Sequence, residues 1–288
     1  MEKRFRQSYS IAELMFELQS DIEISCNEEF TDFIQSGKAD YQICIGKAEG
    51  AERIKGMLIA RESGFNVYKL DEGLLYEYMD VNGNPYAFGR VDLDQSRVTV
   101  KYLHNALKHI SHSRGAFFHI RWEELLLDKK RLILHACCVE TFYGGILFSG
   151  VSGIGKSTQG NLWCQYEDAK LINGDRPILY KKENGWHAYG SPYAGSSHCH
   201  VNQNTKVRVI VLPEQEKMCA IRKLEKVEAF RKIFSQLTLA AWNPDSIGRA
   251  CDIVESLLDN IPVYEMRCTP DKRAVDLLKQ TIEEEVSR

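Results

Sequence analysis

A glycine-rich segment near the middle of the chain has the residue types that bind phosphate. The segment ILFSGVSGIGKSTQGNLW, residues 146–163, carries the pattern G-x-x-x-x-G-K-S from Gly150 to Ser157. Glycines allow backbone torsions that turn successive N–H groups toward one anion, and the N-terminus of a following helix adds a favourable dipole. Lys156 is placed to reach the terminal phosphates, and the Ser157 hydroxyl suits a Mg²⁺ ion. The segment therefore predicts binding of a nucleotide, with ATP and Mg²⁺ as the expected cofactors.

The expected nucleotide contacts form one continuous set in the chain. They are Gly150, Ser152, Gly153, Ile154, Gly155, Lys156, Ser157 and Thr158. A glycine-rich turn without a ligand is the alternative, and the match at every fixed position of the pattern disfavours it. The dinucleotide pattern G-x-G-x-x-G is absent from the segment, so nicotinamide chemistry is not expected.

Phosphoryl transfer also requires a metal-binding carboxylate and a group that takes the proton of the acceptor. Asp175 ends the apolar run in KLINGDRPILY and is the candidate for either role, although an ordinary turn aspartate before Pro177 is an equal alternative. His135 lies in LILHACCVE, one predicted strand before the glycine loop. A buried, hydrogen-bonded histidine is the commoner interpretation. Its position before the loop makes His135 a catalytic candidate together with Asp175 and Lys156.

The glycine loop needs a strand before it and a helix after it, and the flanking residues predict both. YGGILFSG is an apolar strand that enters the loop, and TQGNLWCQYEDA has a helical pattern. The segment ILYKKENGWHAYG predicts a hairpin that turns at Asn184–Gly185. Further strands are expected at KLING, KVRVIVLPE, CAIRKL and PVYEMRC, and helices at VEAFRKIFSQLTLAAW, DSIGRACDIVESLLDN and PDKRAVDLLKQTIEEEV.

The first part of the chain has a different pattern. Short β-type runs alternate with turn residues over the first hundred or so residues, which predicts a mostly antiparallel sheet. A helix is expected over residues 112–130, where apolar residues recur at helical intervals. We therefore divide the chain into a β-rich N-terminal portion, residues 1–110, and a nucleotide-binding domain, residues 111–288.

Composition and charge indicate which kinds of partner the protein binds and in which cellular compartment it is expected. Of the 288 residues, 27% are charged and the net charge is −3, so no basic field attracts nucleic acid or anionic lipid. No apolar stretch approaches the length of a membrane span, and MEKRFRQSYS is not followed by the apolar segment of an export signal. The nine cysteines include no C-x-x-C pair, which favours reduced thiols over a zinc site. We expect a soluble, cytoplasmic protein without nucleic-acid or membrane partners, either a monomer or a homo-oligomer.

Taken in order, the segments LHACCVE, GGILFSGVSGIGKST, LINGDRP, AYGSPYAG and KVRVIVLP resemble the HPr kinase/phosphorylase and phosphoenolpyruvate carboxykinase-like superfamily of P-loop proteins. The resemblance covers residues 125–278, and its most specific part is L-H-x-x-x-V followed by S-G-x-G-K-S-T. It implies an α/β fold with α+β character, in which a P-loop core of this type follows a β-rich N-terminal portion. It also implies an ATP- and Mg-dependent kinase that phosphorylates a serine-type hydroxyl of a small molecule or peptide.

The resemblance assigns roles to individual residues. His135 would lie beside the phosphates, Lys156 would hold them, Ser157 would hold the metal, and Asp175 would match the second acid of an aspartate pair. Gly174 occupies the position of the first acid, so it stays open whether Asp175 is a base, a metal ligand or both. The C-terminal signature of HPr kinases is not found in DSIGRACDIVESLLDN, so HPr is not the expected acceptor.

Because Gly174 replaces the first acid of the aspartate pair, we also consider a function that is not enzymatic. Under that hypothesis the chain is a nucleotide-binding accessory protein with vestigial catalysis that regulates a partner. The small-residue segment GSPYAGSS, residues 190–197, is either a loop that closes over the acceptor side of the nucleotide or a plain connection.

Overall fold

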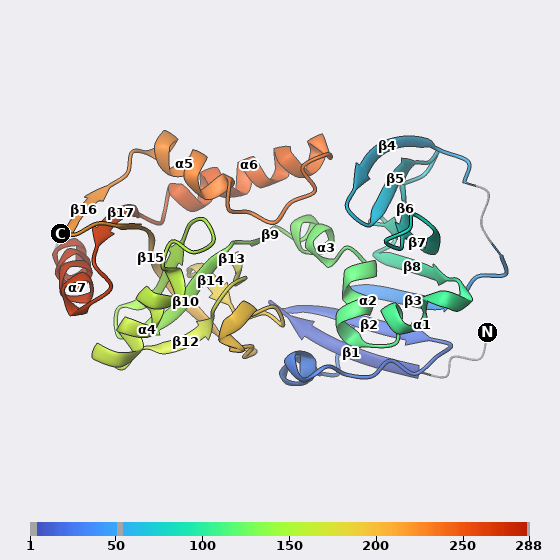
Figure 1. The fold of residues 1–288 in the computed structure, drawn as a ribbon, viewed down its shortest axis with the longest axis horizontal. Helices are drawn as coiled ribbons and strands as arrows, with labels where there is room; N and C mark the ends of the chain where they lie inside the picture. The colour runs from blue at the N-terminus through green and yellow to red at the C-terminus, as the bar shows by residue number, and fades with distance from the viewer. Residues whose placement is uncertain (1–4, 51–53, 287–288) are drawn as a thin grey trace. The chain divides into compact units, whose positions relative to one another are not determined.

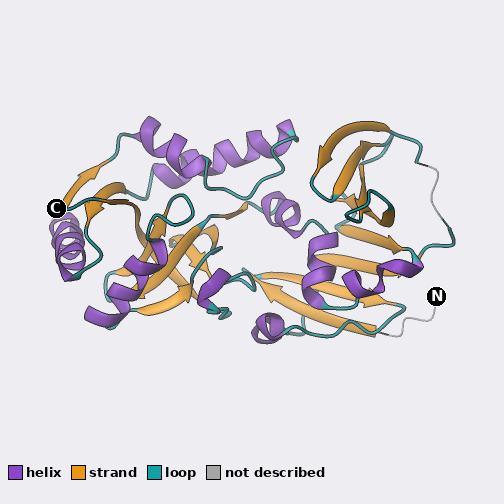
Figure 2. Cartoon of the chain, in the orientation of Figure 1, coloured by secondary structure: helices purple, strands orange, loops and turns teal. Residues whose placement is uncertain are grey.

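The chain contains two β-sheets and several helices, in agreement with the predicted mixture of strand and helix segments (Figures 1 and 2). The computed structural model describes residues 5–50 and 54–286, so the first four residues of MEKRFRQSYS lie outside the described part. The chain divides into two compact units, residues 1–128 and 129–288, each built around its own sheet.

The first unit contains an eight-stranded sheet in the order β1-β2-β3-β8-β7-β6-β5-β4. Its strands are β1 (Phe5–Ile11), β2 (Leu14–Ser20), β3 (Tyr41–Lys47), β4 (Met57–Glu62), β5 (Phe65–Lys69), β6 (Leu74–Met79), β7 (Pro85–Asp92) and β8 (Arg97–Tyr102). The neighbours β2–β3 and β3–β8 pair in parallel, and the other pairs are antiparallel. The sheet is therefore mostly antiparallel, as predicted.

Short helices complete the first unit. They are η1 (Glu28–Phe33), η2 (His104–Ala106), α1 (Leu107–Ile110), α2 (Ser113–His119) and α3 (Trp122–Asp128). The single helix expected over residues 112–130 is thus divided, because Arg121 adopts a φ of 54° between α2 and α3. This left-handed conformation interrupts the helical hydrogen-bond ladder.

Aromatic packing explains why α2 and α3 belong to the first unit. Phe117 of α2 contacts the rings of Tyr9, Phe16 and Phe30, with centroid separations between 5.0 and 5.6 Å. The Tyr41 hydroxyl donates to the Leu125 carbonyl of α3 over 3.1 Å. The sequence analysis assigned residues 111–128 to the nucleotide-binding domain. In the structure the boundary between the compact units instead follows Asp128, because these apolar helix faces are buried against the first sheet.

The second unit contains the glycine loop and a second, mixed sheet. The main path of this sheet runs β12-β10-β11-β15-β14-β13-β9, and β17 joins β15 to β16. Its strands are β9 (Arg131–Ile133), β10 (Ala136–Thr141), β11 (Gly144–Ser149), β12 (Lys170–Asn173), β13 (Ile178–Lys182), β14 (Gly185–Tyr189), β15 (Asn204–Gln215), β16 (Ala220–Lys223) and β17 (Val263–Cys268). Its helices are α4 (Lys156–Tyr166), η3 (Gly195–Ser197), α5 (Lys226–Phe234), α6 (Pro244–Leu258) and α7 (Lys272–Val286).

The predicted elements around the glycine loop are confirmed, but two others in this unit are wrong. A strand enters the glycine loop, a helix leaves it, and β13 and β14 form the expected hairpin, in which Gly185 has a φ of 121°. The run RLILHACCVE forms two strands, β9 and β10, and the helix expected over residues 227–242 ends at Phe234, where tight i→i+3 backbone hydrogen bonds at Gln236 and Leu237 turn the chain. One face of the sheet packs against α4 and α7, with Trp163 of α4 fully buried. Burial of these apolar side chains is the main favourable term that fixes α4 on the sheet.

Two findings bear on the compositional expectations. All nine cysteines lie in the described residues and are free thiols. Among the described residues, no helix is both long enough and apolar enough to cross a membrane.

Candidate functional site

The topology of the second sheet brings three chain segments to one edge. Strand β10 runs antiparallel to β11, so Ala136 at its start pairs with Ser149 at the end of β11. Strand β12 runs antiparallel to β10, so its last residue, Asn173, pairs with Cys138 near the start of β10. The residue before β10, the loop after β11 and the turn after β12 therefore lie at the same edge. These positions hold His135, Gly150 and Asp175.

Hydrogen bonds tie these segments together. The Ser149 hydroxyl donates to the His135 carbonyl over 3.0 Å, and the Ala136 amide donates to the Asp175 carbonyl over 3.0 Å. The His135 amide donates to the Gln236 carbonyl over 2.9 Å. The backbone at His135 is thus fixed between the glycine loop, the Asp175 turn and the segment after α5.

The glycine loop has the conformation that its composition predicts. Gly150, Gly153 and Gly155 adopt φ values of 143°, 81° and 111°, which side chains with a Cβ rarely allow. The backbone amide of Gln159 donates to the Gly155 carbonyl over 3.0 Å, which is the first hydrogen bond of α4. Because α4 begins at Lys156, the amides of its first turn have no acceptor within the helix and are available to an anion.

Lys156 extends back along the loop that precedes it. Its Nζ donates to the Gly150 carbonyl over 2.9 Å and to the Val151 carbonyl over 3.1 Å, and the residue is buried. Ser157 and Thr158, in the first turn of α4, are exposed. The ammonium group and the exposed hydroxyls therefore accompany the first-turn amides at one helix N-terminus.

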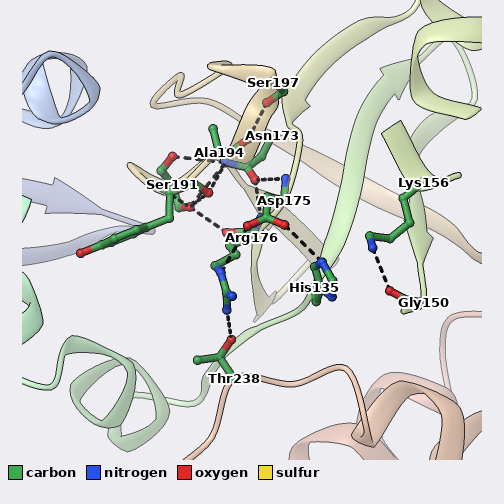
Figure 3. A network of polar contacts seen from close by, with 11 residues as sticks. His135, Gly150, Lys156, Asn173, Asp175, Arg176, Ser191, Ala194, Ser197 and Thr238 are labelled. Carbon is green, nitrogen blue, oxygen red and sulfur yellow. Dashed lines mark hydrogen bonds and ion pairs between the residues drawn. The ribbon is translucent and has the colours of Figure 1, made fainter. Parts of the chain in front are cut away.

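Opposite the loop, Asp175 lies between two nitrogen-bearing side chains (Figure 3). His135 Nε2 is 3.2 Å from Asp175 Oδ1, and Arg176 Nε is 3.3 Å from Asp175 Oδ2. Arg176 also donates from Nη1 to the Thr238 hydroxyl over 2.6 Å. The carboxylate is about a quarter exposed, so it is oriented on both oxygens and still accessible to a ligand.

The turn that presents Asp175 is held by a buried asparagine. Asn173 Oδ1 accepts from the amides of Asp175 and Arg176 over 3.0 and 2.7 Å, which is the geometry of an Asx turn. Asn173 Nδ2 donates to the Ser191 carbonyl over 3.2 Å, and the Ser191 hydroxyl donates to the Arg176 carbonyl over 2.7 Å. This network fixes the direction in which Asp175 leaves the sheet.

The segment after β14 packs against the same turn. A Cβ at Gly174 would lie 2.1 Å from Ser197 Oγ and 2.3 Å from Ser197 Cβ. A Cβ at Gly195 would lie 2.9 Å from Asp175 Cβ. The loop therefore covers the Gly174–Asp175 turn, and Ser197 occupies the space into which any side chain at position 174 would extend.

Electrostatic effects connect the loop to the Asp175 group. Burial lowers the pKa of Lys156, and the Asp175 carboxylate partly opposes that change. Burial also lowers the pKa of His135, with the Lys156 charge adding to the effect and the Asp175 carboxylate opposing it. Each of the three groups thus lies within electrostatic reach of the other two. With a pKa below the usual value near 6.5, His135 is mainly neutral at neutral pH.

The predicted catalytic residues His135, Lys156 and Asp175 share one sheet edge with all the predicted nucleotide contacts. Sequence reasoning missed three residues that position Asp175, namely Asn173, Arg176 and Ser191. The tripeptide Asn173-Gly174-Asp175 carried a usable signal for the first, because an asparagine that ends a strand before a glycine favours an Asx turn. The other contacts depend on distant segments.

The contact between Gly174 and Ser197 leads to a stability prediction. Gly174→Ala should destabilise the chain by about 1–3 kcal/mol, the usual cost of overpacking a filled space. Combining it with Ser197→Gly should recover most of the loss. Urea unfolding measures both changes. Gly248→Ala, where a Cβ would meet nothing within 4 Å, is the matched control and should not destabilise the helix. If the urea concentration at the unfolding midpoint is the same for Gly174→Ala as for the unaltered chain, Ser197 does not pack against residue 174.

Comparisons with known proteins add little to this description. No family model matches the chain, and no curated protein matches it. Among solved structures, the HPr(Ser) kinase/phosphatase from Coxiella burnetii is similar over 54% of this chain and 90% of that chain. The TM-score is 0.30 and the sequence identity is 15%. Similarity at this level carries no argument about activity, so the functional case rests on the residues of the site.

Proposed function

We propose that the second unit is an ATP- and Mg-dependent phosphotransferase, with a P-loop core, that phosphorylates a hydroxyl acceptor. The observation that carries the proposal is the position of Asp175. Its carboxylate lies at the same sheet edge as the glycine loop, close enough to affect the pKa values of Lys156 and His135. A phosphate-binding loop and an oriented carboxylate are the two parts that phosphoryl transfer requires from a protein.

The residues of the site fit a magnesium ion that arrives with the nucleotide. Among the described residues, no group of three or more His, Cys, Asp and Glu side chains forms a preformed metal cage. Magnesium in nucleotide sites usually takes only one or two protein oxygens and completes its coordination with phosphates and water. The exposed Ser157 hydroxyl and the accessible Asp175 carboxylate are suited to that role. Bound there, Mg²⁺ would neutralise charge on the β- and γ-phosphates.

The remaining chemistry belongs to the side chains. The amides of residues 150–158 and the Lys156 ammonium bind the polyphosphate and stabilise charge on the transferred group. Asp175 accepts the proton of the acceptor hydroxyl as the acceptor oxygen bonds to the γ-phosphorus, and the bond from that phosphorus to the bridging oxygen of ADP breaks. Neutral His135 donates from Nε2 to Asp175 and keeps the carboxylate aimed at the acceptor.

The test is acceptor-dependent consumption of ATP. The purified full-length chain is incubated with Mg·ATP and a panel of serine-bearing small molecules and peptides, and ADP is measured for each. We expect ADP above background with a subset of acceptors, together with a mass gain of one phosphoryl group on those acceptors. ATP binding without ADP formation for any acceptor would reject the transferase, and absence of ATP binding would reject the nucleotide site as well.

A second candidate function follows from the space beside Gly174. Because Ser197 fills the place of a first acidic side chain, the described site holds one carboxylate where a pair would support both the metal and the proton transfer. This favours a nucleotide-binding accessory protein with vestigial catalysis. Under that alternative, ATP raises the melting temperature and promotes binding of a second protein, while no acceptor is phosphorylated.

A further inference from the structure

We infer that a cavity beside the end of the glycine loop, on the side of the loop away from His135 and Asp175, holds the base and ribose of the nucleotide. The inference rests on the proposed function, since it assumes that the polyphosphate lies on residues 150–158. The cavity has a volume of about 740 Å³. Pockets for small organic ligands have volumes of about 300–1,000 Å³, so the cavity is large enough for a nucleoside.

The position of the cavity links it to the phosphate site. Ile154 and Gly155, at the end of the glycine loop, form part of its wall, as does Thr158 in the first turn of α4. The opposite walls come from residues 213–218, where β15 ends, and residues 268–270, which follow β17. A nucleotide whose phosphates bind the first-turn amides would therefore have its nucleoside end beside this cavity.

The parallel pairing of the sheet explains why the cavity forms there. Strands β11, β15 and β17 are parallel neighbours, so their carboxyl ends open at the same edge. Crevices outside the carboxyl ends of parallel strands are the usual ligand positions in open α/β sheets. His135 and Asp175 approach the loop from β10 and β12, on the other side of β11. The acceptor and the nucleoside thus have separate places on either side of the loop.

The lining has the chemistry of a nucleoside pocket. Ile154, Met218 and Pro270 provide apolar surface for the faces of a base, and the exposed Glu216 provides acceptors for ribose hydroxyls. Gln159 is buried in the wall, where its Nε2 donates to Cys268 Sγ over 3.2 Å and its Oε1 has no hydrogen-bond partner among the described residues. The Gln159 side chain therefore fills the wall between α4 and the end of β17, and its Oε1 is enclosed there.

One further contact connects the cavity wall to the loop. Gln215 Nε2 lies 3.3 Å from the Gly153 carbonyl and 3.4 Å from the Ile154 carbonyl. Through this contact the last residue of β15 supports the loop backbone from the cavity side. A nucleoside in the cavity would therefore pack against the same segment, residues 213–218, that supports the backbone of the glycine loop.

A comparison of two ligands separates the cavity from the loop. Calorimetry measures the affinity of Mg·ATP and of Mg·tripolyphosphate, which has the phosphates without the nucleoside. We expect ATP to bind at least tenfold more tightly than tripolyphosphate to the unaltered chain. Pro270→Trp and Met218→Trp, which add bulk at exposed lining positions, should each weaken ATP at least tenfold and leave tripolyphosphate unchanged. Phe142→Trp, at an exposed position in the turn between β10 and β11, is the matched control.

The outcomes are distinguishable. Equal affinity for ATP and tripolyphosphate in the unaltered chain would overturn the nucleoside pocket while keeping the phosphate loop. Absence of binding by both ligands would overturn the proposed function and the inference together. Unchanged ATP affinity in both tryptophan variants would place the nucleoside elsewhere.

Photolabelling gives a measurement that does not depend on variants. An ATP analogue with a light-activated azide on the adenine is bound to the full chain and irradiated, and labelled peptides are identified by mass spectrometry. We expect labels within residues 213–218 or 268–270, and excess tripolyphosphate should compete them away. Labels confined to peptides from other parts of the chain would overturn the assignment.

Discussion

Replacing Lys156 with methionine is expected to lower acceptor-dependent ATP consumption by about 10²–10³-fold, the usual effect of removing one group that stabilises transition-state charge. Methionine keeps the buried aliphatic length of the side chain and removes the ammonium that donates to the Gly150 and Val151 carbonyls. The affinity for Mg·ATP should also fall, because the proposed function has the same charge contact the terminal phosphates in the ground state. Steady-state kinetics and calorimetry measure the two effects.

The control for this variant is a lysine of the same unit that lies away from the loop. Lys181 of β13 is exposed and donates to the Ser256 hydroxyl of α6. Lys181→Met removes the same charge and should leave ATP affinity and turnover nearly unchanged. If Lys156→Met and Lys181→Met behave alike, the loop does not hold the phosphates.

Replacing Asp175 with asparagine is expected to lower turnover by about 10²–10⁴-fold, the range typical of a lost general base. ATP affinity should be equal or slightly tighter, because a negative charge near the phosphates has been removed. The Asx turn should survive, since Asn173 accepts from backbone amides that the substitution does not alter. The expected signature is therefore a loss in the rate of transfer with no loss in nucleotide binding.

The same variant decides between the two roles left open for Asp175. If the carboxylate acts as the base, the Mg²⁺ concentration that gives half-maximal activity should be unchanged. If the carboxylate holds the metal, that concentration should rise and ATP affinity should fall with it. His135→Gln is the companion variant, and a smaller loss of turnover than in Asp175→Asn would agree with a positioning role. Full activity in Asp175→Asn would reject the phosphotransferase proposal.

Local patterns predicted the elements around the loop because their causes are local. The glycines at 150, 153 and 155 were expected to need unusual torsions, and each has a positive φ. A hairpin was expected at Asn184–Gly185 from those two residues alone. β13 and β14 form it, but the turn lies one residue earlier, at Glu183–Asn184, and Gly185 begins β14 with a φ of 121°. In both cases neighbouring residues decide the backbone conformation, so the signal is contained in a short stretch.

The segment RLILHACCVE shows a strand prediction that a local pattern could not make correctly. Its continuous apolar run predicted one strand, whereas the structure divides it into β9, which pairs with β13, and β10, which pairs with β11 and β12. The division falls at Leu134 and His135. A run of buried residues looks the same whether it serves one set of strand partners or two, because the partners come from distant parts of the sequence.

The sequence by itself determined that a glycine loop with the pattern G-x-x-x-x-G-K-S lies between a strand and a helix, with a histidine before it and an aspartate after it. Only the tertiary structure decided that His135, Arg176 and Asp175 meet at one edge, that Ser197 fills the space beside Gly174, and that the chain divides after Asp128. The physical reason is that torsional preferences act over a few residues, whereas strand order, side-chain packing and cavities arise from contacts between segments far apart in the chain.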